Sequence, residues 1–150
     1  MENDVFIILI NRSLRSNFYI WYFVLIVSGV FCFITKYSFP KLDVALSVNL
    51  QQLLVLVLLT GIPGILVWSK NKMKMLSEIS DISSRLRLYK KYVQIRQSVF
   101  FILGFFILFI QVFTSMKGAV MLFCVVICIC LFIIPTKGRL EMEAQIPESE

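Results

Sequence analysis

Uncharged, strongly apolar stretches alternate with short polar segments along this chain of 150 residues. Four such stretches, at about 17–35, 44–68, 98–116 and 118–136, contain no charged side chain, and Asp43 lies just before the second. Each is close to the roughly 20 residues that a helix needs to cross about 30 Å of hydrocarbon. Backbone polar groups in lipid must be satisfied within the segment, so such runs form helices. The pattern predicts an all-α integral membrane protein with four transmembrane helices.

The composition agrees with this class. Hydrophobic side chains make up 59% of the chain and charged side chains 16%, whereas soluble domains average about 45–50% and about 25%. The length accommodates one domain, so residues 1–150 are predicted to form a single four-helix transmembrane domain. Because the outer connections are short, consecutive helices are expected to pack antiparallel as a bundle.

Basic residues are distributed unequally between the two sides that four crossings create. Both ends of the chain and the connection at 69–97 share one side, and only Lys36, Lys41 and Lys117 fall on the other. Twelve of the 15 Lys and Arg residues therefore lie on the first side, which the positive-inside rule assigns to the cytoplasm. We expect a multi-pass protein of the plasma (inner) membrane with both termini cytoplasmic.

The segment 71–97 carries an apolar stripe that is typical of an amphipathic helix. Apolar residues recur there with the spacing 4-3-4-3-4, as in the a/d seam of a coiled coil, and charged residues surround them. We therefore expect an amphipathic, basic cytoplasmic helix between the second and third spans. The stripe comprises Met75, Ile79, Ile82, Leu86, Tyr89 and Val93.

Eight basic residues accompany the stripe, opposed by Glu78 and Asp81, so that this part of the chain alone carries a charge of +6. Three interpretations remain open: contact with an anionic inner leaflet, docking against a membrane-protein partner or a second copy, and extension of the neighbouring spans into the cytoplasm. Nucleic acid is not an expected partner, because the charges are juxtamembrane and no recognition fold accompanies them. The basic residues are Lys70, Lys72, Lys74, Arg85, Arg87, Lys90, Lys91 and Arg96.

A cluster of Gly61, Pro63 and Gly64 interrupts the apolar run of the second span. Proline removes a backbone donor and clashes with the preceding turn, so a helix kink is expected there. One interpretation is a packing kink with close helix contact at the two glycines. The other is the broken-helix binding site of some transporters, which needs a matching interruption in another span. The nearest is Pro135, at the very end of the fourth span.

Polar side chains occur near the outer ends of the second and third spans. Asn49, Gln51 and Gln52 precede the middle of the second, and Gln111 and Thr114 follow the middle of the third. They are therefore expected at similar depth. Hydrogen bonds between helices, each worth about 0.6 kcal/mol, are one explanation. The other is a polar outer vestibule for a small solute, formed by Asn49, Gln52, Gln111 and Thr114.

Groups for catalysis or metal binding are scarce. The chain has no His, and all nine carboxylates lie outside the spans, so we expect no metal, no cofactor and no acid–base enzyme. Cys124 and Cys128 share one helical face at i, i+4, Cys130 points elsewhere, and Cys32 lies at a depth similar to Cys124. Four-helix membrane thiol oxidoreductases resemble the chain in size, but the C-x-x-C motif that they place near the outer surface is absent here.

Two short segments flank the spans. Residues 5–10 are apolar but too short to cross a bilayer, so they form either an interfacial helix or a short buried stretch. Residues 140–150 carry four glutamates and no basic residue, and Pro147 opposes a helix. We expect this acidic tail to be disordered.

Together these features favour a small, non-enzymatic membrane protein of accessory or scaffolding type that acts through helix–helix and inner-leaflet contacts. The alternative is a small homo-oligomeric transporter or channel with a polar outer vestibule. Small multidrug exporters are similar in layout but depend on a membrane glutamate, and the spans here contain no carboxylate, so proton coupling of that kind is not expected. A membrane thiol oxidoreductase acting through Cys32 and Cys124 is the second alternative.

Overall fold

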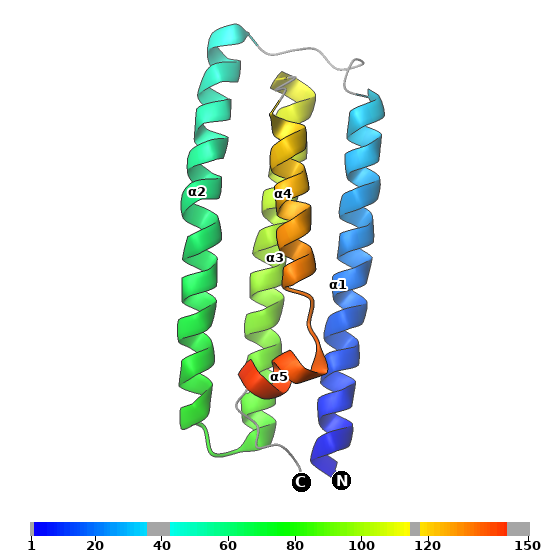
Figure 1. The fold of residues 1–150 in the computed structure, drawn as a ribbon, viewed down its shortest axis with the longest axis vertical. Coiled ribbons are helices and arrows are strands. Elements are labelled where there is room, and N and C mark those ends of the chain that lie inside the picture. The colour runs from blue at the N-terminus through cyan, green and yellow to red at the C-terminus, as the bar shows by residue number, and fades with distance from the viewer. Residues whose placement is uncertain (1, 36–42, 115–117, 144–150) are drawn as a thin grey trace.

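The computed structural model describes residues 2–35, 43–114 and 118–143, and these ranges contain helices and turns but no strand (Figure 1). The all-α prediction is therefore confirmed for the described part of the chain. Three helices are long and apolar enough to cross a membrane, or four segments if α4 and α5 count as one bent span. The helices are α1 (Glu2–Thr35), α2 (Val44–Lys74), the 3-10 turn η1 (Met75–Glu78), α3 (Ile82–Thr114), α4 (Ala119–Phe132) and α5 (Lys137–Glu143).

The three long helices exceed the thickness of a bilayer. With 34, 31 and 33 residues in α1, α2 and α3, their lengths are about 45–50 Å at 1.5 Å per residue, against about 30 Å of hydrocarbon. Residues 5–10 are the first turns of α1 and not a separate interfacial helix, and Ile7 and Ile10 are buried. The helices are thus longer than a crossing of the hydrocarbon requires, and α1, α2 and α3 all reach towards the end of the molecule where α1 begins (Figure 1).

Helix α3 is the centre of the bundle. It packs against α1, α2 and α4, and α4 lies alongside it in Figure 1. In its most apolar window 56% of the residues are buried, compared with 11% in the corresponding windows of α1 and α2. Helices α1 and α2 therefore turn most of their apolar surface outward, as lipid-facing helices do.

The buried apolar residues form two separate clusters. The upper core, in the orientation of Figure 1, includes Phe18, Leu54, Ile107 and Val126, contributed by α1, α2, α3 and α4. The lower core lies towards the end where α1 begins, and α4 contributes no buried residue to it. Its buried members are Ile7, Ile10, Leu14, Met73, Leu76, Leu86, Tyr89, Val93 and Leu140.

The segment 71–97 does not form the separate amphipathic helix that its pattern predicts. Helix α2 runs to Lys74, η1 follows, and α3 begins at Ile82. The break at 79–81 is stabilised locally: the Asp81 carboxylate accepts hydrogen bonds from the backbone N–H groups of Ser83 and Ser84, at 3.3 and 2.9 Å. Asp81 is thus the N-cap of α3. Helices α2 and α3, joined by η1 and residues 79–81, form a long helical hairpin.

The end of the predicted fourth span is bent. Helix α4 ends at Phe132 after 14 residues, or about 21 Å, and α5 follows at an angle of 78°. The bend is fixed by Arg139, whose guanidinium donates to the Phe132 carbonyl at 2.6 Å and whose N–H donates to Thr136 Oγ1 at 3.3 Å. Residues 140–143 of the predicted disordered tail lie in α5, and 144–150 are outside the described residues.

Two glycines permit close approach between helices. A Cβ on Gly29 would lie 2.8 Å from Cε1 of Phe123 in α4, and a Cβ on Gly104 would lie 2.9 Å from Cδ1 of Leu25 in α1. A Cβ on Gly61 or Gly64 would meet no atom within 4 Å in the described structure. The close helix contact expected at Gly61 and Gly64 is therefore not made by any of the described residues.

Replacing glycine by alanine is predicted to have opposite effects at Gly29 and Gly61. Each change gains about 1 kcal/mol of helix propensity, but at Gly29 the new methyl group displaces the Phe123 ring, and overpacking costs about 1–3 kcal/mol. In detergent, Gly29→Ala should lower the thermal unfolding midpoint, whereas Gly61→Ala should leave it unchanged or raise it. Equal midpoints for the two variants would contradict this packing.

The Asp81 cap is predicted to protect the first turn of α3. Hydrogen bonds from the Ser84 hydroxyl, the Ser84 N–H and the Ser83 hydroxyl lower the pKa of Asp81 from 3.8 to about 2. The Asp81 carboxylate therefore stabilises the folded protein fully at pH values above its unfolded pKa of 3.8. This stabilisation is lost as the pH falls through the folded pKa of about 2. At pH 7, Asp81→Ala should accelerate amide hydrogen exchange at residues 82–85, while Asp81→Asn, also a good cap, should change it little. Unchanged exchange in the alanine variant would argue against the cap.

Candidate functional site

A layer of polar side chains separates the upper core from the lower core. On α3, Arg96 and Gln97 lie between Val93 of the lower core and Phe100 of the upper core, and on α2 the buried Ser69 precedes Met73 of the lower core. The hydroxyl of Tyr89 and the carboxylate of Glu143 in α5 reach the same place. We call Ser69, Tyr89, Arg96, Gln97 and Glu143 the polar layer.

Arg96 is the centre of this layer. It is 6% exposed, and its Nη1 donates to Ser69 Oγ and to Glu143 Oε1, both at 3.4 Å. Tyr89 donates its hydroxyl hydrogen to Glu143 Oε2 at 3.2 Å, and Arg139 Nε lies 3.6 Å from Glu143 Oε1. The carboxylate of Glu143 therefore connects α5 to α3 and balances part of a buried positive charge.

The local sequence explains how α5 delivers this carboxylate. Leu140 and Glu143 are three residues apart and so lie on one face of the helix. Leu140 is fully buried in the lower core, which turns Glu143 towards α3. On the outer side of α5, Lys137 and Glu141 form an exposed i, i+4 ion pair at 3.4 Å.

Several donors in the polar layer are unsatisfied. Arg96 Nε, Arg96 Nη2 and Gln97 Nε2 are buried without a hydrogen-bond partner among the described residues, and so is the acceptor Asn11 Oδ1 of α1. Unpaired polar groups that are shielded from water cost about 1–3 kcal/mol each, and more when they are charged. The layer therefore has more donors than the described residues satisfy.

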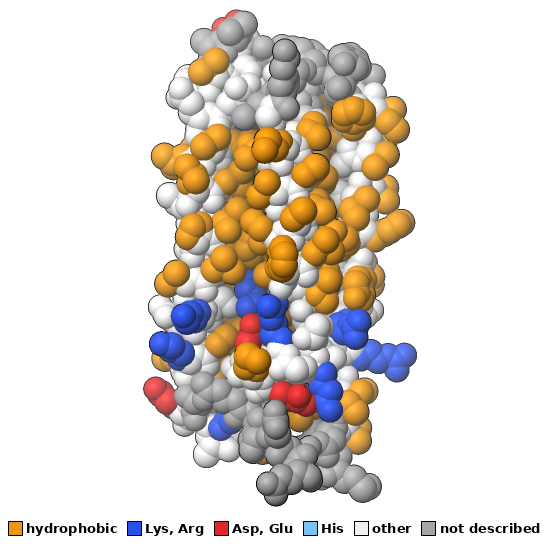
Figure 2. Space-filling model, in the orientation of Figure 1, with side chains coloured by type: hydrophobic (Ala, Val, Ile, Leu, Met, Phe, Trp, Pro, Cys, Tyr) orange, Lys and Arg blue, Asp and Glu red, His pale blue; other side chains and the backbone are white. Residues whose placement is uncertain are grey.

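The predicted basic contact residues divide into two groups. Lys70, Lys74, Arg87 and Lys91 are exposed and Lys72, Arg85 and Lys90 partly so, and basic side chains gather at the lower end of the molecule (Figure 2). Arg96 differs, because it is buried against α2 and α5. A direct role of Arg96 in lipid or partner contact is thus not supported by its position in this conformation.

The apolar stripe faces the inside of the bundle. Leu86, Tyr89 and Val93 are fully buried in the lower core, and Ile79 and Ile82 pack against it. The remaining member, Met75, is exposed in η1. Of the three interpretations of this segment, extension of the spans describes its geometry, and the stripe stabilises the hairpin of α2 and α3 from within.

The structure does not gather the predicted vestibule residues at one place. Gln52 lies with Gln51 in a hollow of about 570 Å³ that is lined by α2 alone, and Asn49 is exposed on the same helix. Gln111 is buried and lines a different cleft, between α1, α3 and α4. The Thr114 hydroxyl donates to the Ile110 carbonyl of its own helix at 2.8 Å.

Helix α2 continues through its proline. Pro63 lies inside the single helix Val44–Lys74, and the ribbon of α2 shows no sharp break along its length (Figure 1). Gly61 is partly exposed, while Pro63 and Gly64 are exposed. The cluster therefore marks an uncovered part of α2, not a site between α2 and its neighbours.

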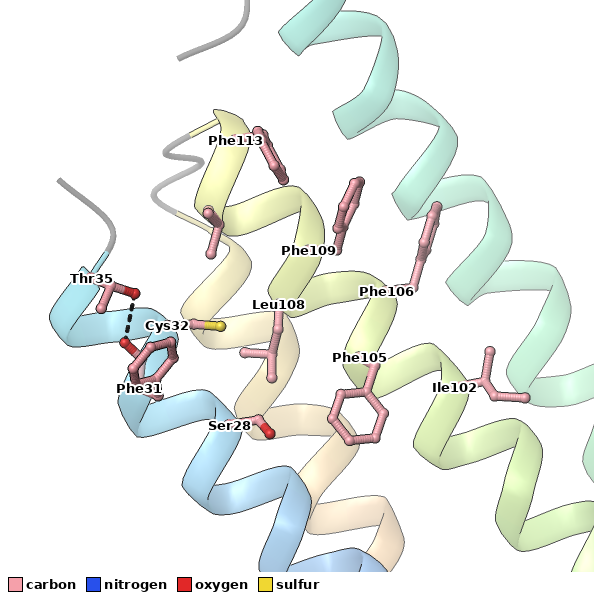
Figure 3. A pocket seen from close by; sticks show the side chains of 11 residues that line it. Ser28, Phe31, Cys32, Thr35, Ile102, Phe105, Phe106, Leu108, Phe109 and Phe113 are labelled. Atoms are coloured by element: carbon pink, nitrogen blue, oxygen red, sulfur yellow. Dashed lines mark hydrogen bonds between the residues drawn. The ribbon is translucent and has the colours of Figure 1, made fainter. Parts of the chain in front are cut away.

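An apolar groove of about 570 Å³ runs between α1 and α3 in the upper half of the molecule (Figure 3). Phe31 and Cys32 line it from α1, and Phe105, Phe109 and Phe113 from α3. Its lining is almost entirely hydrocarbon, so it suits an acyl chain or another apolar surface.

All four cysteines are free. Cys124 and Cys128 line the cleft between α1, α3 and α4, as their spacing predicts, and Cys130 is buried in the upper core. Cys32 lines the other groove. Among the described residues no three His, Cys, Asp or Glu side chains come together in a way that could hold a metal ion.

Sequence reasoning missed most of the polar layer. The composition of residues 140–150 places Glu143 in an acidic tail, and no sequence pattern singles out Ser69 or Gln97. The available signals were weak: the i, i+3 pair of Leu140 and Glu143, and a single arginine, Arg96, directly before an apolar run.

Comparison with known proteins provides no assignment, because no family model, no curated protein and no solved structure matches this chain.

The polar layer predicts an asymmetric mutational response. Glu143→Ala leaves the Arg96 charge buried and uncompensated, so it should destabilise the fold by about 3 kcal/mol. Arg96→Met should lower the stability of the fold less. Glu143 then keeps its ion pair with Arg139, and the Glu143 side chain is 23% exposed to solvent. The measurement is thermal or denaturant unfolding in detergent.

The control is Glu141→Ala, which removes only an exposed pair and should cost less than about 1 kcal/mol. In the double variant Arg96→Met with Glu143→Ala, most of the loss caused by Glu143→Ala should be recovered. Additive losses in this cycle would show that the two side chains do not stabilise each other.

Proposed function

We propose that this chain is a non-enzymatic accessory or scaffolding protein of the plasma (inner) membrane, which crosses the bilayer four times with both termini in the cytoplasm. It acts through helix–helix contacts in the membrane and through basic contacts with the inner leaflet. The observation that carries the proposal is the uncovered face of α2, which presents polar and small residues away from its own bundle.

The distribution of side-chain types supports the proposed membrane placement. Figure 2 shows hydrophobic side chains over the upper and middle parts of the visible face and charged side chains towards the lower end. The first charges below the apolar region are Arg15 of α1, Lys70 of α2, Arg96 of α3 and Lys137 of α5. Their common level supports a cytoplasmic boundary there, because positive charge is favoured on that side of a membrane. Helix α4, continued by residues 133–136, supplies the fourth crossing.

The α2 face is a row of exposed residues along one side of the helix. The residues follow one another at intervals of three or four, the spacing that places side chains on one face. Among the described helices α2 packs chiefly against α3, on its opposite side. We call this row the α2 face: Asn49, Leu53, Leu56, Thr60, Gly64 and Val67.

The chemistry of the α2 face fits a second transmembrane helix. An amide such as that of Asn49 gains by exchanging lipid for an interhelical hydrogen bond. Thr60 and Gly64 are four residues apart and small, which lets another helix approach closely, and no atom of the described chain lies within 4 Å of a Cβ placed on Gly64.

Charge favours a different protein over a second copy as the occupant. The α2 face continues below the membrane to exposed Lys70 and Asn71. Two copies in the same orientation would bring the lysines of both α2 helices together, which disfavours pairing. A partner helix with acidic residues at its cytoplasmic end would complement this surface.

The alternative is a homo-oligomeric transporter or channel. Within one chain the amides do not form a vestibule, because Gln52 and Gln111 line separate hollows. A polar route would therefore require the α2 faces of several copies to meet around Asn49 and Gln52. No observation favours this arrangement over a heterologous partner.

Site-specific photo-crosslinking in the native membrane tests the proposal. A photoreactive residue at Leu56, which is 60% exposed on the α2 face, should give one discrete heterologous product, whereas one at Phe23, 68% exposed on α1, should not. Gly64→Leu should lower the yield of that product and of the complex seen by native mass spectrometry by about tenfold, a loss of roughly 1.4 kcal/mol.

A product between two copies of the chain, crosslinked through Leu56, would replace the accessory function by the oligomeric transporter and direct work to solute flux in liposomes. A chain that is recovered as a monomer and gives equal products from Leu56 and Phe23 would contradict both.

A further inference from the structure

The polar layer contains an excess of hydrogen-bond donors. Arg96, Gln97, Ser69 and Tyr89 supply guanidinium, amide and hydroxyl hydrogens, and the charged acceptor that the described structure gives them is the carboxylate of Glu143. Arg96 Nε, Arg96 Nη2 and Gln97 Nε2 remain without a partner among the described residues, although the Arg96 side chain is only 7% exposed. A buried set of this kind is complementary to an anion.

Glu143 uses only part of this capacity. A guanidinium binds a carboxylate or phosphate through two parallel N–H groups at about 2.7–2.9 Å. Glu143 engages Nη1 alone, at 3.4 Å, and shares its Oε1 with Arg139 at 3.6 Å. The contact is longer and less complete than an anion that enters freely would make.

Helix α5 is also weakly attached. It has seven residues, too few for independent helical stability, and the non-helical residues 133–136 connect it to α4. Leu140 and the Glu143 contacts hold it against the bundle, at the end where the charged side chains gather (Figures 1 and 2). Local opening of a short peripheral helix costs much less than global unfolding.

We propose that the polar layer is a binding site for a carboxylate or phosphate group, and that Glu143 occupies it as an internal ligand. When α5 opens, the Arg96 fork binds the incoming anion bidentately, with the Ser69 and Tyr89 hydroxyls as further donors. The same chemistry is offered by the phosphate of an anionic lipid at the inner leaflet and by a soluble anion from the cytoplasm. The site does not depend on the accessory function proposed above.

The first test is stabilisation of the full-length Glu143→Gln variant by inorganic phosphate. This change removes the internal anion but keeps the shape of the side chain. At ten times the dissociation constant, phosphate should raise the unfolding midpoint of this variant by about 3–5 °C and that of the unmodified protein by less. Glu141→Gln, the same change on the exposed side of α5, should respond like the unmodified protein.

The second test separates the two sources of the anion. Glu143→Gln is placed in nanodiscs of phosphatidylcholine alone or with phosphatidylglycerol, and bound lipid is counted by native mass spectrometry. Retention of phosphatidylglycerol that Arg96→Met abolishes would identify a lipid ligand. A response to inorganic phosphate without lipid retention would identify a soluble one.

The unmodified protein provides a third measurement that does not depend on the stability of a variant. Phosphate should accelerate hydrogen exchange in residues 137–143, because it displaces Glu143, and should not do so in Arg96→Met. If Glu143→Gln gains nothing from phosphate or phosphatidylglycerol beyond the unmodified protein, or if Arg96→Met together with Glu143→Gln gains equally, the binding site is disproved.

Discussion

The packing of three helices against α3 is the constraint on which the rest of the structure depends. More than half of its apolar window is buried, whereas α1 and α2 bury about a tenth of theirs, so α3 supplies the common surface of the bundle. Gly104 is accommodated there by Leu25 of α1. Helices α1 and α2 extend beside the lower part of α3, whereas α4 ends above it, and the lower ends of the three long helices are packed around a second core.

That second core explains why a buried arginine is tolerated. Between the two apolar clusters Arg96 is shielded from water while α5 is docked, so its charge must be met by groups of the protein. Ser69 of α2 and Glu143 of α5 meet it from different sides. The polar layer thus fixes the positions of α2, α3 and α5 along the bundle axis. Leu and Ile contacts do this less specifically, because they are interchangeable.

The all-helical class follows directly from the sequence, because long uncharged runs have few alternatives in lipid. The contacts between helices are harder to predict from the sequence. The stripe at Leu86, Tyr89 and Val93 has the same period whether it faces lipid or the inside of a hairpin, and only the cap at Asp81 decides between one helix and two. Arg96 looked like one of eight surface charges, since a partner 47 residues away leaves no local trace. Asn49, Gln52 and Gln111 are expected at similar heights along their helices, but their side chains lie on different sides of the bundle. Counting residues from the end of a span predicts the height and not the side.

The separation of Arg96 and Glu143 along the chain also has a consequence for biogenesis. Arg96 is synthesised before Glu143, so α1, α2 and α3 can pack before the carboxylate of α5 exists. Docking of α5 then brings in that carboxylate, and it follows the synthesis of α4, which precedes α5 in the chain. The ion pair of Arg96 and Glu143 therefore belongs to the contacts that form last as the chain is made.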